Sequence, residues 1–430
     1  MKKYILIILC CLTSFPLWSY NVNMIVEHYS VDQGLPNNTV NCTLKDRDGF
    51  IWFGTWYGLC CFDGVKFKTF NKQEHDSDVP PRKIQRIVED KNGYIWVKTI
   101  DRKLYVFNKV TECFHAVYDD MKNYSENIQV IKLQNTAEGD VLLLTKDKNL
   151  LLAGVDEKGQ VTIKILFDSR NEINKHDYTL KHHVLCETEE YISWIGIDYK
   201  VAAVHKGSEL ASRPADFITS KINSGDKDSF TSFFEDGRKV WVGDRAGIFY
   251  SIDVRTGLVN RYVLSEIKGA ISNLLVTPAG YVYLSVAGQG TYEYDLAERR
   301  LQKINTEMND AMVTHAFIDQ YDKIWFHENE KALIYYDPLN HTAKRFPFTM
   351  FGKITTLYSE DAGERGLFFL SPAGEAWLFD REHAEMVYIN KLKQLSNDRA
   401  NQQFYHLMLD NDGVLWLSSA DEGVYCMNFP

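Results

Sequence analysis

Short runs of apolar residues alternate with turn residues along this chain, in a pattern that returns every 42 to 52 residues. The clearest unit runs from Thr39 to Phe70. It contains a first strand, a turn at Asp48-Gly49, the apolar run Phe50-Ile51-Trp52-Phe53, an aromatic strand that ends at Asp63, and a last strand. Asp-Gly and Asn-Gly pairs accept the positive φ of tight turns, so the unit predicts four short antiparallel strands.

The unit is repeated nine times. The copies centre on these residues of the second strand: Trp52, Trp96, Leu142, Trp194, Trp241, Tyr283, Trp325, Phe368 and Trp416. A four-stranded repeat of this length, with a large apolar residue in its second strand, is typical of a β-propeller blade. We therefore expect an all-β propeller of about nine blades in a single ring. An eight-bladed ring, or a seven-bladed ring followed by a partial second ring, remains open at this point.

The two ends of the chain fit ring closure. The ninth repeat stops after its third strand, Val424-Tyr425-Cys426-Met427, and a lone strand, Ile25 to Tyr29, precedes the first repeat. Pairing the two would complete the last blade and remove exposed sheet edges. Residues 20–430 are thus expected to form the propeller, with the N-terminal strand closing the last blade.

The first 19 residues have the features of an export signal. Lys2 and Lys3 precede an apolar stretch from Tyr4 to Leu12, which is too short to span a bilayer. We interpret residues 1–19 as a cleaved signal peptide, and the mature chain is expected in the periplasm.

Composition agrees with an exported β protein. Aromatic residues make up 13% of the 430 residues and favour strands, while a net charge of −10 disfavours binding to nucleic acid.

The expected mature chain has six cysteines without a CxxC pair, which we interpret as small buried residues. Asp46-Arg47-Asp48-Gly49 and Asp410-Asn411-Asp412-Gly413 resemble fragments of calcium loops but lack the remaining ligands, so they are interpreted as turns. No metal or cofactor is expected.

Three segments of the first repeat carry a family resemblance: Gly34 to Val40, Asp48 to Thr55, and Gly58 to Gly64. They closely resemble the regulator-propeller repeats of hybrid two-component sensor histidine kinases from gut Bacteroidetes. The resemblance implies a periplasmic propeller that senses breakdown products of complex polysaccharides. In that family two propellers are followed by a β-sandwich, a membrane helix, a kinase and a DNA-binding regulator, none of which follows Pro430. The chain is expected to be either a fragment of such a sensor or a separate relative, and kinase activity is not carried over. The partners expected are an oligosaccharide and either a membrane-bound sensor kinase or a second copy of the chain.

Loops that join blades, and those between second and third strands, emerge on one face of a propeller, which we expect to bind the ligand. Trp56 and Tyr57 occupy such a turn, where aromatic rings can stack on sugars. Basic side chains on the same face could attract carboxylated or sulfated sugars. The candidate binding residues are Asn38, Trp56, Tyr57, Arg102, Lys103, Lys148, Tyr199, Lys200, Arg245 and His327.

Two other functions stay open. A propeller can carry a carbohydrate-active hydrolase or lyase, for which Tyr199 and His327 would be the acid-base candidates, although GxSxG, HExxH and phosphate-loop motifs are absent. The broad face could instead serve as a platform for a protein partner.

Overall fold

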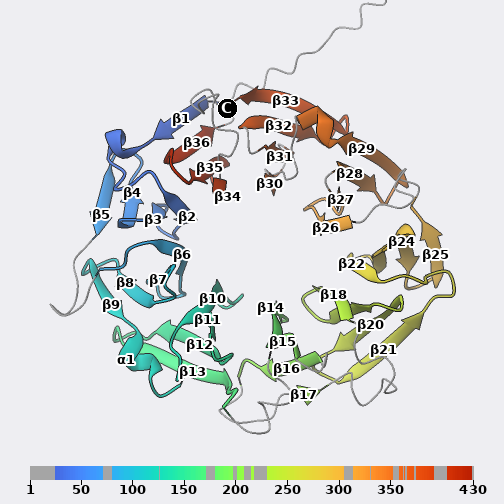
Figure 1. Ribbon diagram of the computed structural model, residues 1–430, viewed down its shortest axis with the longest axis horizontal. Helices are drawn as coiled ribbons and strands as arrows, with labels where there is room; N and C mark the ends of the chain where they lie inside the picture. The colour runs from blue at the N-terminus through green and yellow to red at the C-terminus, as the bar shows by residue number, and fades with distance from the viewer. Residues whose placement is uncertain are drawn as a thin grey trace, which may run out of the picture.

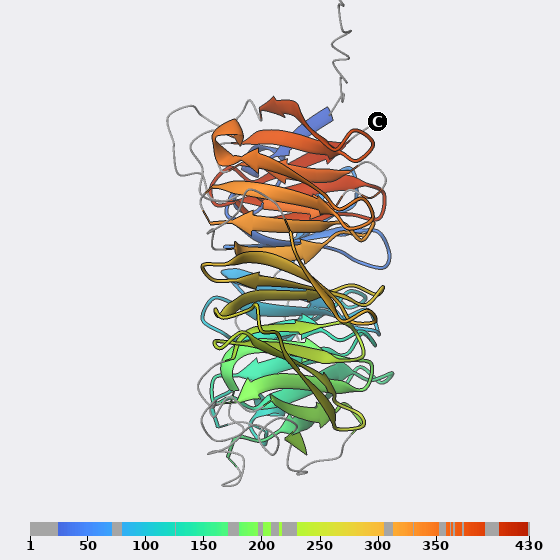
Figure 2. The same cartoon turned by 90° about the vertical axis from the view of Figure 1, so that its right-hand side faces the viewer.

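The computed structural model shows one ring of nine four-stranded antiparallel sheets among the residues it describes (Figure 1). These are residues 25–70, 80–124, 126–170, 180–196, 201–207, 215–216, 230–304, 313–329, 331–351, 358–361, 363, 366–371, 374–391 and 404–428. Seen from the side, the ring is a flat disc (Figure 2). The expected nine-bladed single ring is confirmed, and the eight-bladed and two-ring alternatives are wrong.

Each blade runs from its innermost strand, at the central channel, to its outermost strand, and the blades are numbered in chain order. The strands are β2 (Val40–Lys45), β3 (Ile51–Thr55), β4 (Gly58–Phe62) and β5 (Phe67–Phe70) in blade 1; β6 (Ile84–Glu89), β7 (Ile95–Thr99), β8 (Leu104–Asn108) and β9 (Cys113–Ala116) in blade 2; β10 (Val130–Asn135), β11 (Val141–Thr145), β12 (Leu150–Val155) and β13 (Val161–Phe167) in blade 3; β14 (Leu180–Glu187), β15 (Tyr191–Gly196), β16 (Val201–His205) and β17 (Ala215–Asp216) in blade 4; and β18 (Phe230–Glu235), β19 (Val240–Asp244), β20 (Ile248–Asp253) and β21 (Leu258–Val263) in blade 5. They continue with β22 (Ile271–Val276), β23 (Tyr281–Val286), β24 (Gly290–Asp295) and β25 (Arg300–Lys303) in blade 6; β26 (Val313–Ile318), β27 (Ile324–Glu328), β28 (Ala332–Asp337) and β29 (Thr342–Pro347) in blade 7; β30 (Tyr358–Asp361), β31 (Leu367–Leu370), β32 (Glu375–Asp380) and β33 (Glu385–Lys391) in blade 8; and β34 (Phe404–Leu409), β35 (Val414–Ser419), β36 (Val424–Asn428) and β1 (Ile25–Tyr29) in blade 9.

The two ends of the described chain meet in blade 9. Strand β1 pairs antiparallel with β36, from Ile25 opposite Asn428 to Tyr29 opposite Val424. Blade 9 is thus built from both ends of the sequence, which removes the open edges that a linear array of sheets would leave.

The hydrophobic core lies between adjacent blades, because both faces of each sheet are covered. Cys60 and Cys61 show this clearly: Cys60 packs in the cluster shared by blades 9 and 1, and Cys61 in the cluster shared by blades 1 and 2. Successive strand residues point to opposite faces, as the sequence led us to expect. All six described cysteines are free thiols.

The turns follow the chemistry expected from the sequence. Gly49, Gly93 and Gly413 have φ values of 91°, 87° and 76°, in the left-handed region that glycine adopts at low cost. At the end of the third strand, Asp63 Oδ1 accepts hydrogen bonds from the backbone N–H groups of Val65 and Lys66, at 2.9 and 2.8 Å. This is the local bonding that reverses the chain into the fourth strand.

Helical structure is limited to short segments in the described chain: η1 (Val31–Gln33), α1 (Tyr118–Met121) and η2 (Phe348–Phe351). None of these helices has the length and apolar character that crossing a bilayer requires.

Candidate functional site: the central channel

The central channel is walled by the innermost strands of the blades, and a β-bulge recurs at the same place in seven of them. The bulges separate Val40/Cys42, Ile84/Arg86, Val130/Lys132, Phe230/Ser232, Ile271/Asn273, Val313/His315 and Phe404/His406. A bulge breaks the alternation of side chains along a strand and redirects them locally. Its recurrence places equivalent residues of different blades at one level of the channel wall.

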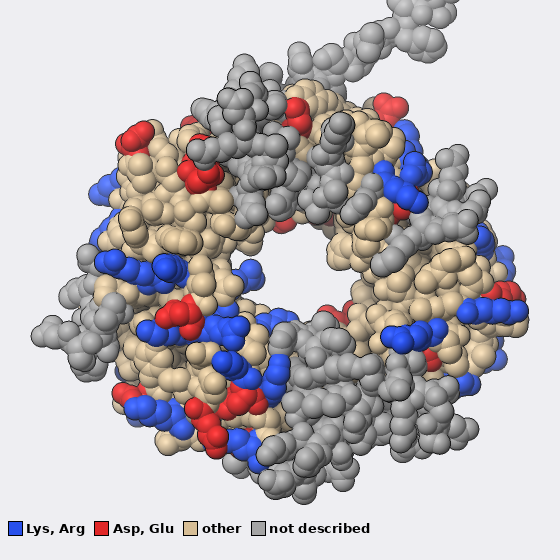
Figure 3. Space-filling view, viewed as in Figure 1, with Lys and Arg blue, Asp and Glu red and all other residues tan. Residues whose placement is uncertain are grey.

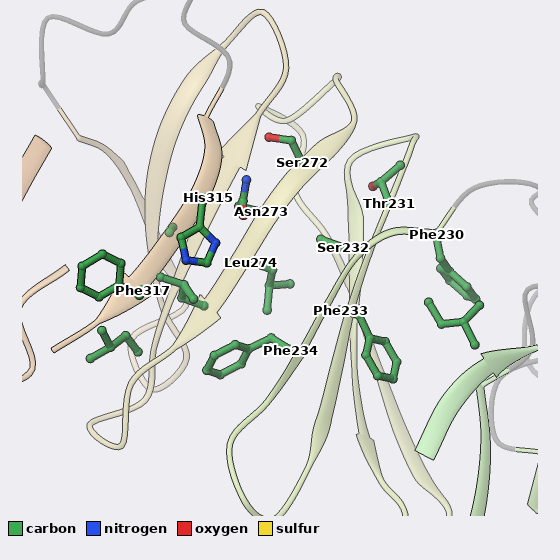
Figure 4. A pocket seen from close by; sticks show the side chains of 14 residues that line it. Phe230, Thr231, Ser232, Phe233, Phe234, Ser272, Asn273, Leu274, His315 and Phe317 are labelled. Carbon is green, nitrogen blue, oxygen red and sulfur yellow. The ribbon is translucent and has the colours of Figure 1, made fainter. Parts of the chain in front are cut away.

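A hollow in the channel wall lies over blades 5 to 7 and has a volume of about 700 Å³. Strands β18, β22 and β26 provide most of its lining, which Figure 4 shows from close by: Phe230, Thr231, Ser232, Phe233, Phe234, Ser272, Asn273, Leu274, Leu275, His315, Ala316, Phe317 and Ile318, with Ile195 of β15. Its size falls in the range of small-ligand sites. The lining combines phenyl rings with hydroxyl, amide and imidazole groups.

Some polar groups of the hollow are used to join neighbouring blades. Asn273 Nδ2 donates to the carbonyl of Val313 at 2.7 Å, and Thr231 Oγ1 donates to the carbonyl of Ile271 at 2.7 Å. These bonds fix the two side chains from blade to blade. Ser232 Oγ is buried without a hydrogen-bond partner among the described residues, and the side chain of His315 is exposed at the hollow. Hydroxyl, imidazole and amide oxygen are suited to bonding the hydroxyl groups of a ligand.

The expected binding face carries the blade-joining loops and is the face seen in Figure 3. Trp56 and Tyr57 are exposed there, at 41% and 62%. The Lys83 ammonium lies 5.2 Å from the centre of the Trp56 ring, so a cation already covers one face of the indole. Asn38 has a structural role, because its Oδ1 accepts the backbone N–H of Val31 at 2.9 Å.

Arg102 and Lys148 occupy equivalent turns of blades 2 and 3. Their backbone N–H groups bond to the carbonyls of Thr99 and Thr145, and their φ values are 67° and 69°. Lys103 follows Arg102 and pairs with Asp101 at 3.5 Å. Both turns therefore hold long basic side chains in the left-handed region, which is unusual for residues other than glycine.

The remaining predicted residues are separated from this group. Arg245 is exposed in the turn between β19 and β20. Tyr199 and Lys200 lie outside the described residues. His327 was expected on a loop, and that placement is wrong: it lies in β27, opposite His315 of β26.

His327 belongs to the layer behind the channel wall. Its Nδ1 is 3.1 Å from Thr314 Oγ1 and its ring packs on Phe348, while Nε2 is buried without a partner among the described residues. Burial, and then the nearby His315, lower the pKa of His327 below its usual value. The partly exposed imidazole therefore packs behind the channel wall.

An acidic cluster lies on the opposite face, where the expected calcium-loop fragment Asp46-Arg47-Asp48-Gly49 forms a turn. Oxygens of Asp46, Asp48 and Glu89 lie within 4.8 Å of one another. The Lys109 ammonium is 3.1, 2.7 and 2.8 Å from these three carboxylates. The positive charge that a metal ion would supply is therefore provided by a side chain of blade 2.

Sequence reasoning missed the channel residues. The hollow of blades 5 to 7 and the basic residues Arg86, Lys98 and Lys132 were not among the candidates. A β-bulge leaves no residue-specific signal in a single sequence, so the innermost strands could not be assigned a channel-facing side. The polar residues that interrupt otherwise apolar first strands were the available clue.

The fold and the hollow define a nine-bladed propeller with a ligand-sized recess in its channel. Residues 34–57 match the protein family described as two component regulator propeller. That match covers the start of the first repeat, where the resemblance was found.

Comparison with solved structures gives distant similarities. One is the extracellular domain of the proposed one-component system BT4673 from B. thetaiotaomicron, with 14% identity and a TM-score of 0.41 over 92% of this chain and 65% of that one. Another is the extracellular domain of the proposed hybrid two-component system BT3049 from the same organism, with 14% identity and a TM-score of 0.36 over 92% and 58%. The Dos1 propeller has 12% identity and a TM-score of 0.49 over 94% and 93%.

The chain thus spans 58–65% of the length of the two Bacteroides domains. At these identities and TM-scores, the likeness does not determine a ligand or a partner for this chain. No curated protein gives a significant match.

Proposed function

We propose that this chain is the ligand-binding propeller of a periplasmic sensing system and that it recognises oligosaccharides released from polysaccharides. The observation that carries the proposal is the channel hollow of about 700 Å³, in which phenyl rings lie beside amide, hydroxyl and imidazole groups. Sugar rings present apolar faces to aromatic side chains and hydroxyl groups to polar ones. The match of residues 34–57 to two component regulator propellers supports a regulatory role.

In this proposal the chain passes its signal to another protein. A membrane-bound sensor kinase or a second copy of the chain would read the ligand-bound state. The expected signal peptide would direct the chain to the compartment where such oligosaccharides arrive.

Calorimetry of the chain with neutral and acidic oligosaccharides tests the proposal. His315→Ala and Phe317→Leu change the hollow, and each is expected to weaken binding about three- to tenfold, the effect of losing one aromatic or hydrogen-bonding contact. Phe50→Ala is the matched control, because Phe50 is 42% exposed in the turn before β3, on the opposite face. Unchanged affinity in both hollow variants would exclude this site.

The same titrations separate the alternative functions. Trp56→Ala and Tyr57→Ala test the rim of the channel independently of the hollow. Chromatography of the oligosaccharides after incubation would detect cleavage, and product formation would replace the sensor proposal with that of a hydrolase or lyase. Failure of every oligosaccharide to bind would contradict both.

A further inference from the structure

Four basic side chains, which we call the cationic arc, lie in blades 2 and 3: Arg86, Lys98, Arg102 and Lys132. Arg86 is exposed on β6 and pairs in register with Lys98 of β7, and Lys132 occupies the equivalent bulge position of β10. Figure 3 shows Lys and Arg side chains at the left edge of the central opening, where Figure 1 places β6 and β10. The hollow of blades 5 to 7 lies across the channel from them.

Lys98 is a buried lysine whose ammonium is bonded to a neutral side chain. Only 6% of the residue is exposed, and its ammonium donates to Gln85 Oε1 at 2.5 Å, a neutral acceptor. Burial, and then the charge of Arg102, lower the pKa of Lys98. Burying an ammonium without a carboxylate is costly, so such a residue calls for a functional explanation.

Three other half-buried ammonium groups of the described structure are each paired with carboxylates. Lys109 contacts three carboxylates, Lys206 lies 2.7 and 2.6 Å from Glu138 and Glu187, and Lys323 lies 2.7 Å from Asp337. The chain has ten more acidic than basic residues, so carboxylates are not scarce. Among the described residues, neither Arg86 nor Arg102 forms an ion pair, and the positive charge of Arg86 acts on Lys132 and His406.

The turn of Arg102 provides an independent observation. Its φ of 67° lies close to the 84° of Gly247, which makes the equivalent backbone bond in the turn between the second and third strands of blade 5. A bulky residue at such a position costs conformational energy that glycine avoids. The position thus carries a basic side chain where a stable turn would favour glycine.

We propose that the channel ligand is an acidic oligosaccharide whose carboxylate or sulfate group binds to the cationic arc. This inference rests on the proposed function and specifies the chemistry of its ligand. Arg86 and Arg102 can each donate paired N–H groups to an oxyanion, while Lys98 and Lys132 add positive charge. An acidic group bound here would supply a negative charge to Arg86, Lys98 and Arg102, none of which forms an ion pair with another described residue.

Calorimetry with three trisaccharides tests this inference: a galacturonate trimer, a sulfated galactose trimer and a neutral galactose trimer. The acidic trimers are expected to bind at least about tenfold more tightly than the neutral one, with an advantage that shrinks as salt is added. Comparing carboxylate with sulfate identifies which oxyanion is preferred. Equal affinities for all three would overturn the inference and leave the proposed function standing, whereas no binding of any trimer would contradict both.

Two substitutions test whether the cationic arc binds the acidic group of the trimers. Arg86→Gln and Arg102→Gly should each weaken binding of the acidic trimers about tenfold or more and leave the neutral trimer unchanged. Arg102→Gly suits the left-handed turn, so its loss of affinity cannot be attributed to unfolding. Arg300→Gln is the matched control, because Arg300 is exposed on the outermost strand β25. Equal weakening of acidic and neutral trimers by the two variants would contradict a charge-specific role.

Discussion

The indole N–H of Trp96 donates a hydrogen bond to Oδ2 of Asp90 at 2.9 Å, and both residues are almost completely buried. The other oxygen of Asp90 accepts the backbone N–H groups of Asn92 and Tyr94, at 2.9 and 3.0 Å. One carboxylate therefore holds the first turn of blade 2 and anchors the tryptophan that packs against blade 3. The same aspartate-to-tryptophan bond occurs in blades 1, 5, 7 and 9, from Asp46, Asp236, Asp319 and Asp410.

Removing this carboxylate should destabilise the ring. Asp90→Ala leaves a buried indole N–H and two backbone N–H groups without their acceptor. We expect the free energy of unfolding to fall by about 3 kcal/mol. Asp156→Ala is the matched control: Asp156 accepts the backbone N–H groups of Lys158 and Gln160 but binds no indole. The free energy of unfolding of the Asp156→Ala variant should fall by only about 1 kcal/mol. Denaturant unfolding measures both variants, and equal losses would show that the indole bond adds nothing.

The sequence was sufficient for the architecture because each blade repeats the same local chemistry. Asp48-Gly49 and its counterparts marked the turns, and the large residue of the second strand set the period. The role of Asp90 was not predicted, although an aspartate six residues before a tryptophan recurs at Asp46, Asp319 and Asp410. The pattern was visible, but the geometry that turns it into a hydrogen bond depends on the path of the chain between the two residues.

The candidate site was less accessible to sequence reasoning. Arg102 and Lys148 were chosen because loop position follows from strand order. Arg86 and Lys132 were missed, since they lie within strands and only the recurrent bulge places them at equivalent positions of the channel wall.

Removing the hydroxyl group of Tyr425 is expected to leave the protein as stable as before or to stabilise it. Its side chain is fully buried, and its hydroxyl has no hydrogen-bond partner among the described residues. Tyr425→Phe removes an unsatisfied polar atom and keeps the ring that stacks on His28, so stability should stay the same or rise by up to about 1 kcal/mol. Tyr283→Phe is the control, because Tyr283 donates to Glu293 at 2.9 Å, and it should cost about 1–2 kcal/mol. Destabilisation by Tyr425→Phe, measured by denaturant unfolding, would reveal a missing partner.

Lys109 is expected to be essential to the contact between blades 1 and 2. Lys109→Met leaves the fully buried carboxylate of Asp46 without its ammonium partner. We expect the free energy of unfolding at pH 7 to fall by about 3 kcal/mol. Calcium should raise the melting temperature of this variant but not that of the unaltered protein, whose cluster Lys109 already fills. Lys68→Met, which breaks an exposed pair with Glu112, should change stability by less than about 1 kcal/mol. Similar losses in the two variants would contradict the role of Lys109.

The last prediction concerns pH and His406, which lies beside the cationic arc. Burial, and then the charge of Arg86, lower its pKa from 6.5 to about 4, and its Nδ1 is hydrogen-bonded to Thr43 Oγ1 at 2.7 Å. Well above pH 6.5 the imidazole is neutral in both folded and unfolded chains, so it adds no pH dependence to the free energy of unfolding. Between pH 6.5 and 4 the unfolded chain binds the proton more tightly, and stability should fall by up to about 3 kcal/mol as the pH is lowered.

His406→Gln should flatten that part of the stability curve, because glutamine does not titrate. His383→Gln is a control of opposite sign: Asp380 raises the pKa of the exposed His383, so its contribution is present at low pH and lost as the pH rises. Denaturant unfolding at half-unit steps from pH 4 to pH 8 measures the difference between each variant and the unaltered protein. An identical pH dependence with and without His406 would show that its imidazole is protonated in the folded ring as readily as in the unfolded chain.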